Sequence, residues 1–524
     1  MRIVNLLVLW ISLSLFLTPL NAQSYINRSH SLGYLATVFT GIHSTDSCLY
    51  IKGVMTDSLY RSGSFFLKAG LNGDILEKTE FVETGKTMDS WHNAMPVTKT
   101  GNFIIPGYLL QSEEPNFSVF LKEINPAGQL IREVNFTSPY YPQNRFIVPI
   151  DAIATSDGGY LVTGNLGNVN NNKTVYYVCK IDSSFNQTFI KAYSGPDSED
   201  GISLLEDING NWLVGGWEIT IGFVQNKASR KRITKIDATT GSVLWNWVYP
   251  PGLPVERAAP VMDMLPLPDG SIIGASSVSI TRPVGNYEEL FYYPTIFKLS
   301  ADRTLAWERR MGNGRYYLEE SWMQAVLPAN DGGGYIGAAA VNFRDTLQTG
   351  ENTVGIIAKV SEQGDSLWAR YIYQPFPLLR LHRVYDIQPS ANKDGYYIAG
   401  TNFVPINDEG QVQQQGWLVR VDNYGCLSPG CHLQVYSPEA PLEDNIHLYP
   451  NPSSAYVVID HGGHDFSQGL FRIHDAQGRA LAEWRAPQGE LSTLVSVAQY
   501  PAGQYWLWYE GPGGERVRKG FVKQ

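Results

Sequence analysis

The chain is dominated by a repeat in which a tight turn, an apolar strand ending at a small residue, a polar loop and a second apolar strand follow one another. Residues 157–182 (DGGYLVTGNLGNVNNNKTVYYVCKID) show this order most clearly. Seven variants occur, and their first strands end at Gly53, Gly107, Gly164, Gly216, Ala275, Ala339 and Gly400. These positions are 54, 57, 52, 59, 64 and 61 residues apart. Such a period is typical of propeller blades or solenoids.

Each unit contains four short apolar stretches, A to D, bounded by Gly, Asp, Asn or Pro, and helical periodicity of useful length is absent. Four antiparallel strands per unit predict an all-β fold with a seven-bladed β-propeller over residues 31–436. We expect Tyr25–Leu32 to be the strand that closes the ring. The A–B and C–D connections are tight turns, whereas three B–C connections are predicted as long loops: Trp217–Arg230, Ser276–Tyr292 and Val341–Thr353.

The antiparallel order places the B–C and D–A connections on the same face, and loops on a rigid scaffold are where binding usually occurs. Charged residues make up 17% of the chain and aromatic residues 12%, as in a rigid, turn-rich β protein. The formal charge of −10 argues against nucleic-acid binding, which needs a basic face.

The N-terminus has the pattern of an export signal over residues 1–22. Arg2 supplies the positive charge, Ile3–Leu17 is the apolar run, and Leu20-Asn21-Ala22 precedes the expected cleavage point. The alternative is a buried N-terminal strand. The apolar run is interrupted and short for a membrane span, and no second long apolar segment occurs, so we expect no membrane span after signal removal.

Four cysteines occur, and two of them, Cys426 and Cys431, lie in one Gly- and Pro-containing turn. In an exported chain this spacing predicts a local disulfide. A metal site including the adjacent His432 is the alternative, but no fourth ligand lies near in sequence. Cys48 and Cys179 fall on strands of blades that do not touch, and we expect both to be small buried apolar residues.

The pattern changes after Ser437–Asn445, a Pro-containing stretch with the composition of a linker. Residues 446–524 contain short apolar stretches separated by turns, among them a hairpin around Asp475–Gly478. About seven short strands in this length predict a small Ig-like β-sandwich.

Several motifs in this region occur in a specific order: Tyr449-Pro450-Asn451-Pro452, Ile473-His474-Asp475 with Gly478, Leu494–Val497, Gly503-Gln504-Tyr505 and the terminal Arg518-Lys519-Gly520-Phe521-Val522. Together they resemble the type A C-terminal sorting domain of the bacterial type IX secretion system. The resemblance implies export through the periplasm, contact with the type IX machinery, and a final location that is secreted or on the outer-membrane surface. His474 departs from the family, which commonly has Tyr there. The alternative is an ordinary accessory sandwich.

Trp245, Trp307 and Trp368 follow Lys235, Lys298 and Lys359 at nearly constant spacing. With the flanking residues they resemble the tryptophan-docking repeats of quinoprotein propellers, and the repeat region as a whole resembles a quinoprotein or kelch-like propeller. The resemblance implies that each Trp locks one blade to the next. A quinone site usually contains acidic calcium ligands and often two adjacent cysteines. This chain has no Cys-Cys pair, so we expect no cofactor. Asp207–Asn211 has a faint likeness to a calcium loop, but its place in the repeat favours a turn.

No sequence signature of catalysis by a serine elbow, a zinc helix or a phosphate loop is found. The D–A connections, expected to open onto a central funnel, nevertheless collect aromatic and charged residues: Trp91, His92, Arg145, Arg257, Trp322, His382 and Arg383. Each alone would be a solvated loop residue, but together they suit a sugar or peptide ligand.

Glu320 with Asp200 would be an acid and base pair for glycoside cleavage. The sequence therefore predicts recognition of a glycan or protein ligand. A glycan-active hydrolase or lyase is the alternative, and a purely structural surface or adhesion protein is a third possibility.

Overall fold

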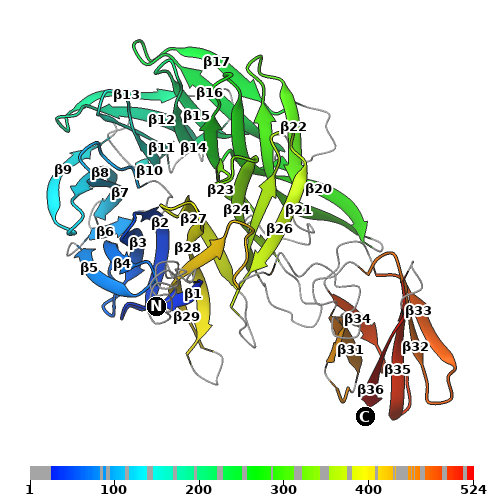
Figure 1. The fold of residues 1–524 in the computed structure, drawn as a ribbon. Helices are drawn as coiled ribbons and strands as arrows, with labels where there is room; N and C mark the ends of the chain where they lie inside the picture. Colours follow the sequence, from blue (N-terminus) through cyan, green and yellow to red (C-terminus); the bar gives the residue numbers. More distant parts are fainter. Residues whose placement is uncertain are drawn as a thin grey trace, which may run out of the picture. The chain divides into compact units, whose positions relative to one another are not determined.

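The computed structural model describes residues 25–82, 86–89, 95–111, 117–137, 145–168, 174–193, 198–220, 228–250, 257–284, 287–311, 321–342, 353–374, 381–406, 411–428, 431, 446–449, 451–453, 455–460, 466–486, 492–511 and 516–524. All named elements in these ranges are β-strands, which confirms the expected all-β class (Figure 1). The described residues divide into two compact units, the first comprising those up to residue 428 and the second those from residue 431 onward.

The first unit is a series of antiparallel sheets in which strands consecutive in the chain pair with one another. Three of the four-stranded sheets are β6 (Lys86–Asp89), β7 (Phe103–Gln111), β8 (Phe117–Ile124), β9 (Leu130–Phe136); β10 (Arg145–Ala154), β11 (Tyr160–Asn168), β12 (Thr174–Ile181), β13 (Gln187–Tyr193); and β14 (Ser198–Glu206), β15 (Trp212–Thr220), β16 (Ala228–Ile236), β17 (Val243–Val248).

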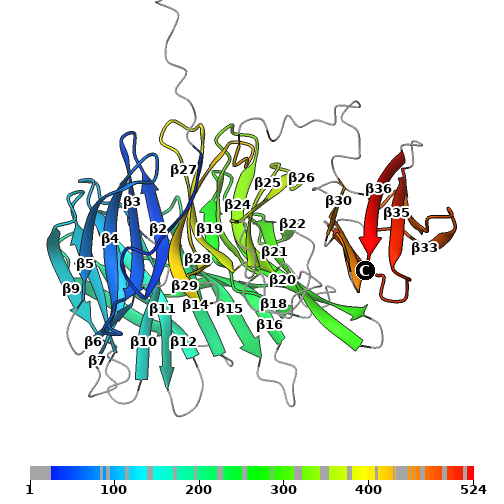
Figure 2. The same cartoon turned by 90° about the horizontal axis from the view of Figure 1, so that it is seen from below.

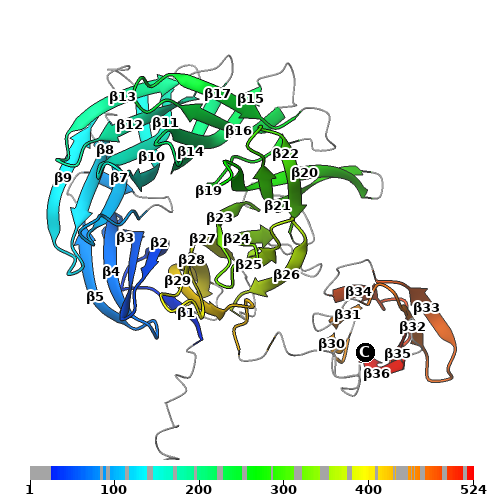
Figure 3. The same ribbon diagram turned by 45° about the horizontal axis from the view of Figure 1, so that its top comes forward.

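The next two sheets continue the same order. The first is β18 (Arg257–Ala258) and β19 (Asp263–Pro266), which both pair with β20 (Ile272–Val284), followed by β21 (Tyr287–Leu299) and β22 (Leu305–Arg310); the second is β23 (Met323–Pro328), β24 (Tyr335–Asn342), β25 (Thr353–Val360) and β26 (Ser366–Ile372). Figure 3 shows the first strand of each sheet on the inside of the unit and the last strand on the outside.

An eight-stranded sheet joins the beginning of the first unit to its end. It contains β27 (His382–Pro389), β28 (Gly395–Pro405), β29 (Val412–Asp422), β2 (Ala36–Ser44), β3 (Cys48–Thr56), β4 (Ser62–Gly70) and β5 (Ile75–Phe81), with β1 (Ile26–His30) paired to β29. The β2 strand meets β29 through the parallel pair Ala36↔Gln414. The β1 strand lies in the segment Tyr25–Leu32, which we expect to close the ring, and it runs antiparallel to β29 of the last repeat.

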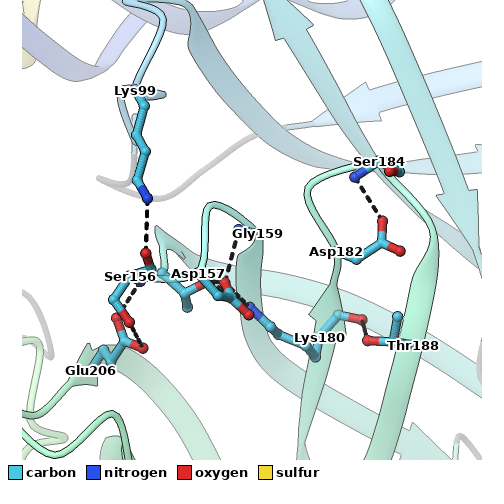
Figure 4. A network of polar contacts seen from close by, with 10 residues as sticks. Lys99, Ser156, Asp157, Gly159, Lys180, Asp182, Ser184, Thr188 and Glu206 are labelled. Atoms are coloured by element: carbon cyan, nitrogen blue, oxygen red, sulfur yellow. Dashed lines mark hydrogen bonds and ion pairs between the residues drawn. The ribbon is translucent and has the colours of Figure 1, made fainter.

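The polar residues of the repeat hold its two tight turns. The Asp157 Oδ1 atom accepts hydrogen bonds from the Gly159 amide (2.9 Å) and from Lys180 Nζ (2.8 Å), as Figure 4 shows. The Asp182 Oδ1 atom accepts one from the Ser184 amide (2.9 Å) in the C–D turn. The contact between the basic residue and the A–B turn recurs as Lys235–Asp207, Lys298–Asp269, Lys359–Asp331 and Arg420–Asp394. The Lys-apolar-Asp pattern thus stabilises two turns: the basic residue contacts the A–B turn, and the aspartate accepts a hydrogen bond from a backbone amide in the C–D turn. Asp207 lies in a turn, as expected.

Successive sheets contact one another through their turns. Lys99 Nζ donates to the Ser156 carbonyl (2.9 Å), and the Ser156 amide donates to Glu206 Oε2 (2.7 Å), so contacts run across neighbouring A–B turns (Figure 4). On the outer side, a Cβ added at Gly425 would lie 2.7 Å from Trp368. Only glycine therefore fits in this turn against the Trp368 indole. This contact agrees with the expectation that the repeated tryptophans pack one four-stranded unit against the next.

The described residues of two predicted B–C loops lie in strands, and this corrects the expectation for those parts of Trp217–Arg230 and Ser276–Tyr292. The β15 strand continues to Thr220 and β16 begins at Ala228, while β20 and β21 pair as far as Val284↔Tyr287. The physical reason is that β-branched and aromatic residues continue beyond the small-residue stop, and such residues favour cross-strand pairing. Figure 2 shows the β20–β21 hairpin projecting beyond its neighbours. The third loop, 343–352, lies outside the described residues.

The second unit contains two sheets around one core. The first is β30 (His447–Tyr449), β31 (Tyr456–Asp460) and β34 (Ser492–Ser496); the second is β33 (Ala480–Trp484), β32 (Leu470–His474), β35 (Gly503–Glu510) and β36 (Arg516–Lys523). Ile459, Phe471 and Leu507 from both sheets are buried in a common apolar cluster. The expected small two-sheet arrangement is therefore observed in the described residues.

The cysteines follow the sequence prediction. Cys426 and Cys431 form a disulfide. Cys48 and Cys179 are free and buried, and burial raises the pKa of the Cys179 thiol. Both free thiols therefore belong to the packed interior.

Candidate functional site

The predicted site residues fall into three groups. Trp91, His92 and Glu320 lie outside the described residues. Arg145 and Arg257 begin β10 and β18, and only their backbones are described. Asp200, Trp322, His382 and Arg383 have described side chains. The pairing of Glu320 with Asp200 therefore stays a prediction.

The structure brings Asp200 and Trp322 together through a residue that the sequence did not single out, Trp217. Asp200 on β14 lies opposite Trp217 on β15. The Trp217 indole Nε1–H donates to Asp200 Oδ2 (2.7 Å), and the Trp217 ring centroid lies 6.4 Å from that of Trp322 in an edge-to-face arrangement. We call these three residues the inner cluster. The sequence signal for Trp217 was its place directly after Gly216, where the B strand continues.

The second oxygen of Asp200 gives the inner cluster its chemical character. The Oδ1 atom is buried and has no hydrogen-bond partner within the described protein. The rings of Trp217 and Trp322 are both partly exposed. A buried carboxylate oxygen without a donor is unfavourable, so this atom favours a hydroxyl or amide donor from a ligand or from water. Aromatic faces beside one polar acceptor are the elements of a small polar-ligand site.

Two charged side chains lie on opposite faces of β16, the strand that pairs with β15 beside the inner cluster. Arg232 is buried, stacks its guanidinium over the Tyr176 ring at 4.1 Å, and lies 3.8 Å from Glu199. On the other face the fully buried Lys231 is ion-paired with Glu308 of the next sheet. Burial lowers the pKa of Lys231, and the Glu308 carboxylate counteracts this shift. These charges are matched in pairs, which fixes the strands on which the cluster lies.

His382 is in the interior and not on an exposed surface, which corrects its expected place among ligand-binding residues. Its side chain is 0% exposed, its Nε2 accepts a hydrogen bond from the Gln374 amide (3.0 Å), and its ring lies 4.7 Å from the Trp417 ring. The Nδ1 atom faces the Thr353 carbonyl at 3.3 Å. Both ring nitrogens are thus occupied by protein groups, and Arg383 next to it is partly buried.

The sorting motifs of the second unit converge on its last strand. Asn451 Oδ1 accepts a hydrogen bond from the Val522 amide (2.9 Å), and the Ser453 amide donates to the Val522 carbonyl (2.8 Å). Tyr505 stacks on Phe521 at 5.5 Å. The Tyr-Pro-Asn-Pro segment is therefore fastened to β36 at the chain end.

The remaining motif residues occupy turns and strands of the same unit. Gly478 has φ +80° in the β32–β33 turn, where a side chain would be strained. Gly503 begins β35, and Lys519 lies on β36 opposite Leu507. Tyr449 ends β30, whereas Pro450 lies outside the described residues.

Among the described residues, no group of three or more His, Cys, Asp or Glu side chains is arranged to hold a metal ion. In the same part of the chain, no helix has the length and apolar character needed to cross a membrane.

Several solved structures are similar to this chain. The β-propeller domain of the Trilobed protease from Pyrococcus furiosus matches with a TM-score of 0.36 and 8% identity over 73% of this chain and 94% of that one. The GH93 alpha-L-arabinofuranosidase of Fusarium graminearum, in complex with arabinobiose, matches with a TM-score of 0.35 and 12% identity. This match covers 62% of this chain and 91% of that one. The endo-arabinase from Bacteroides thetaiotaomicron matches with a TM-score of 0.28 and 12% identity, over 55% of this chain and 100% of that one.

No curated protein matches the chain. Residues 447–523 match the family described as the secretion system C-terminal sorting domain. This match confirms the resemblance of the second unit to a type IX sorting domain, and such a tail indicates an exported cargo protein.

Proposed function

We propose that this exported cargo carries a seven-bladed β-propeller that recognises a glycan at the inner cluster. The proposed organisation is a signal peptide at 1–22, the propeller at 31–436, a linker at 437–445 and an Ig-like sorting domain at 446–524. The blade count is supported by the eight-stranded sheet, in which β2 to β5 and β27 to β29 with β1 are two groups of four that meet at one parallel pair.

One observation carries the choice of ligand. Trp217 uses its indole N–H on one oxygen of Asp200 while its ring lies against Trp322, and the other oxygen has no partner in the described protein. A sugar offers apolar ring faces to aromatic side chains and hydroxyl donors to an acceptor. A peptide with an amide donor next to an apolar side chain would satisfy the same groups, so a protein ligand is the second candidate.

A glycan-active hydrolase or lyase remains the alternative function for the same place. Asp200 is a partly exposed residue whose Oδ2 atom accepts a hydrogen bond from an indole N–H, and Glu320 lies two residues before Trp322 in sequence. A glycosidase requires two carboxyl groups about 5–10 Å apart across the scissile bond. Release of reducing sugar that is abolished by both Glu320→Gln and Asp200→Asn would establish this alternative.

The proposal is tested by a glycan array probed with the exported protein, followed by calorimetric titration of the best glycan. We expect Trp322→Ala and Asp200→Asn each to weaken binding by about ten-fold or more, because each removes one contact to a desolvated group. Tyr60→Ala and Asp74→Asn are matched controls, since both residues are exposed and distant from the cluster in sequence. A glycan that binds the wild type and both cluster variants equally would refute this location.

The proposed final location is the medium or the outer-membrane surface, reached through the periplasm and the type IX machinery. The fastening of Asn451 to β36 supports the view that the machinery reads a folded tail. Removal of residues 446–524 is expected to leave the propeller in the periplasm, as measured by cell fractionation. Appearance of the truncated protein in the medium at the wild-type level would contradict this route.

A further inference from the structure

Three aspartates occupy equivalent places on innermost strands. Asp151, Asp263 and Asp386 each lie four residues before the amide that closes their A–B turn. In each case the Oδ2 atom accepts a hydrogen bond from a backbone amide on the first strand of the next four-stranded group: from Leu204 (2.7 Å), Val326 (2.9 Å) and Ile42 (2.9 Å), respectively. For Asp151 and Asp263 this strand belongs to the following sheet, and for Asp386 it belongs to the other half of the eight-stranded sheet. We call them the inner aspartates. They link neighbouring groups of strands directly, side chain to backbone.

The second oxygen of each inner aspartate is also held. Asp151 Oδ1 accepts from the Ala152 amide and Asp263 Oδ1 from the Met264 amide, both at 2.8 Å, while Asp386 Oδ1 accepts from Gln388 Nε2 at 3.3 Å. Two donors on one carboxylate fix its rotamer and therefore the position of the strand that it reaches.

The receiving sheets lack an aspartate at the equivalent place. Gly41, Ser203 and Ala325 stand there, one residue before the amides of Ile42, Leu204 and Val326. A small side chain leaves room for the incoming carboxylate. The links therefore alternate around the unit and do not join every pair of sheets.

Two of the three links end on the strands that hold the inner cluster. Asp151 fixes β14, which carries Asp200 and Leu204. Asp263 fixes β23, which begins directly after Trp322. The Trp217 and Trp322 rings come from sheets with a third sheet between them in chain order, so their contact depends on the spacing of three sheets.

We propose that Asp151 and Asp263 are positioning residues for the inner cluster: Asp151 holds the strand that carries Asp200, and Asp263 holds the strand that begins after Trp322. This inference rests on the proposed function, because it gives the two links a role in ligand recognition. Asp386 makes the same kind of link to β2, which carries no residue of the cluster. It is therefore a control built into the same fold.

The protonation of the inner aspartates gives the proposal a specific signature. Burial raises the pKa of Asp151 to about 7, of Asp263 to about 6 and of Asp386 to about 7. The charged groups that face them are one another and Lys52: Asp263 raises, and Lys52 lowers, the pKa of both Asp151 and Asp386. Protonation converts one acceptor oxygen into a donor and weakens one of the two bonds. Asp→Asn imitates this neutral state at every pH.

The test measures near-UV circular dichroism of the full protein, as the difference from its Trp322→Phe variant, and glycan affinity, both from about pH 5 to about pH 8. In the wild type, the tryptophan-pair signal should strengthen as pH rises through about 6 to 7. Asp151→Asn and Asp263→Asn should lose this pH response and weaken glycan binding about ten-fold at the upper pH, the loss expected for one bond to a charged group. Asp386→Asn should keep both properties.

The outcomes separate this inference from the proposed function. If the wild type binds no glycan, the spectroscopic response still decides whether the two aspartates position the cluster. If the wild type binds glycan but Asp151→Asn and Asp263→Asn keep its signal and affinity, the positioning role is wrong and the function stands. Equal loss in Asp386→Asn would overturn the inference by showing a general structural effect. Should Asp151→Asn not fold, Asp263→Asn carries the same comparison.

Discussion

A single substitution, Asn27→Ala, removes the side-chain hydrogen bonds that help to hold β1 on the last sheet. Trp417 is fully buried, and its Nε1–H donates to Asn27 Oδ1 (2.8 Å). The Asn27 side chain also donates to the Tyr373 carbonyl (2.9 Å). The substitution removes both bonds and leaves the buried indole N–H without this acceptor.

The magnitude follows from these two bonds. An unsatisfied buried donor costs about 1–3 kcal/mol, and loss of an ordinary hydrogen bond costs about 1 kcal/mol more. The free energy of unfolding should therefore fall by about 2–4 kcal/mol. In urea unfolding followed by tryptophan fluorescence, this corresponds to a midpoint shift of about 1 M for an m-value near 3 kcal/mol/M.

The neighbouring residue supplies the control. Arg28 on the same strand forms an ion pair with Asp74 in which the side chains are 51% and 59% exposed. Such a pair contributes about 0–1 kcal/mol, so Arg28→Ala should barely move the midpoint. If Asn27→Ala and Arg28→Ala are equal, or if Asn27→Ala and Trp417→Phe are strictly additive, the reasoning about the buried bond is refuted.

Three further predictions concern other parts of the chain. Burial raises the pKa of Asp386 to about 7, above its unfolded value, so the stability that it contributes at acid pH should be lost as pH rises from about 4 to about 7, by about 1–4 kcal/mol. The unfolding midpoint of the wild type should fall across this range, and Asp386→Asn should make this fall smaller, since Asp151 and Asp263 still contribute to it. Gly425 has φ +72°, and a Cβ added there would lie 2.7 Å from Trp368, so Gly425→Ala should lower the free energy of unfolding by about 2–4 kcal/mol. Gly210→Ala is the control, because Gly210 has φ +77° but lies in open space, and it should cost about 1 kcal/mol. Equal thermal midpoints for the two variants would contradict the packing argument. Asn451→Ala should lower the free energy of unfolding of the second unit by about 1–2 kcal/mol and reduce the exported fraction, measured by cell fractionation. Normal export of the destabilised protein would show that the secretion machinery does not depend on the bond between Asn451 and Val522.

The sequence predicted the four-stranded units well because their signals are local. The apolar run of the third repeat lies in β11, and Asp182 closes the C–D turn that its motif indicated. The pairing of Tyr25–Leu32 with the last repeat was also predictable, since the last repeat has one strand fewer than the others and the other chain end can supply it. The disulfide between Cys426 and Cys431 followed from spacing and the expected export.

The candidate site was predictable only in part, because its contacts join distant segments. Trp217 was assigned to a loop, although continuation of the A–B pairing beyond Gly216 would have placed it opposite Asp200. His382 was expected at the surface from its position before strand A, but its ring packs on Trp417 in the interior. The link from Asp151 to the next sheet has no local pattern, since any small polar residue fits a strand bulge.

The central claim is that ligand recognition takes place at Asp200, Trp217 and Trp322. Its most direct test is the indole ¹⁵N–¹H spectrum of tryptophan-labelled protein during titration with the glycan selected on the array. The account predicts that the Trp217 and Trp322 resonances, identified by single Phe substitutions, shift together with the dissociation constant found by calorimetry. Saturating glycan that leaves both resonances unmoved while it shifts other tryptophans would contradict the account.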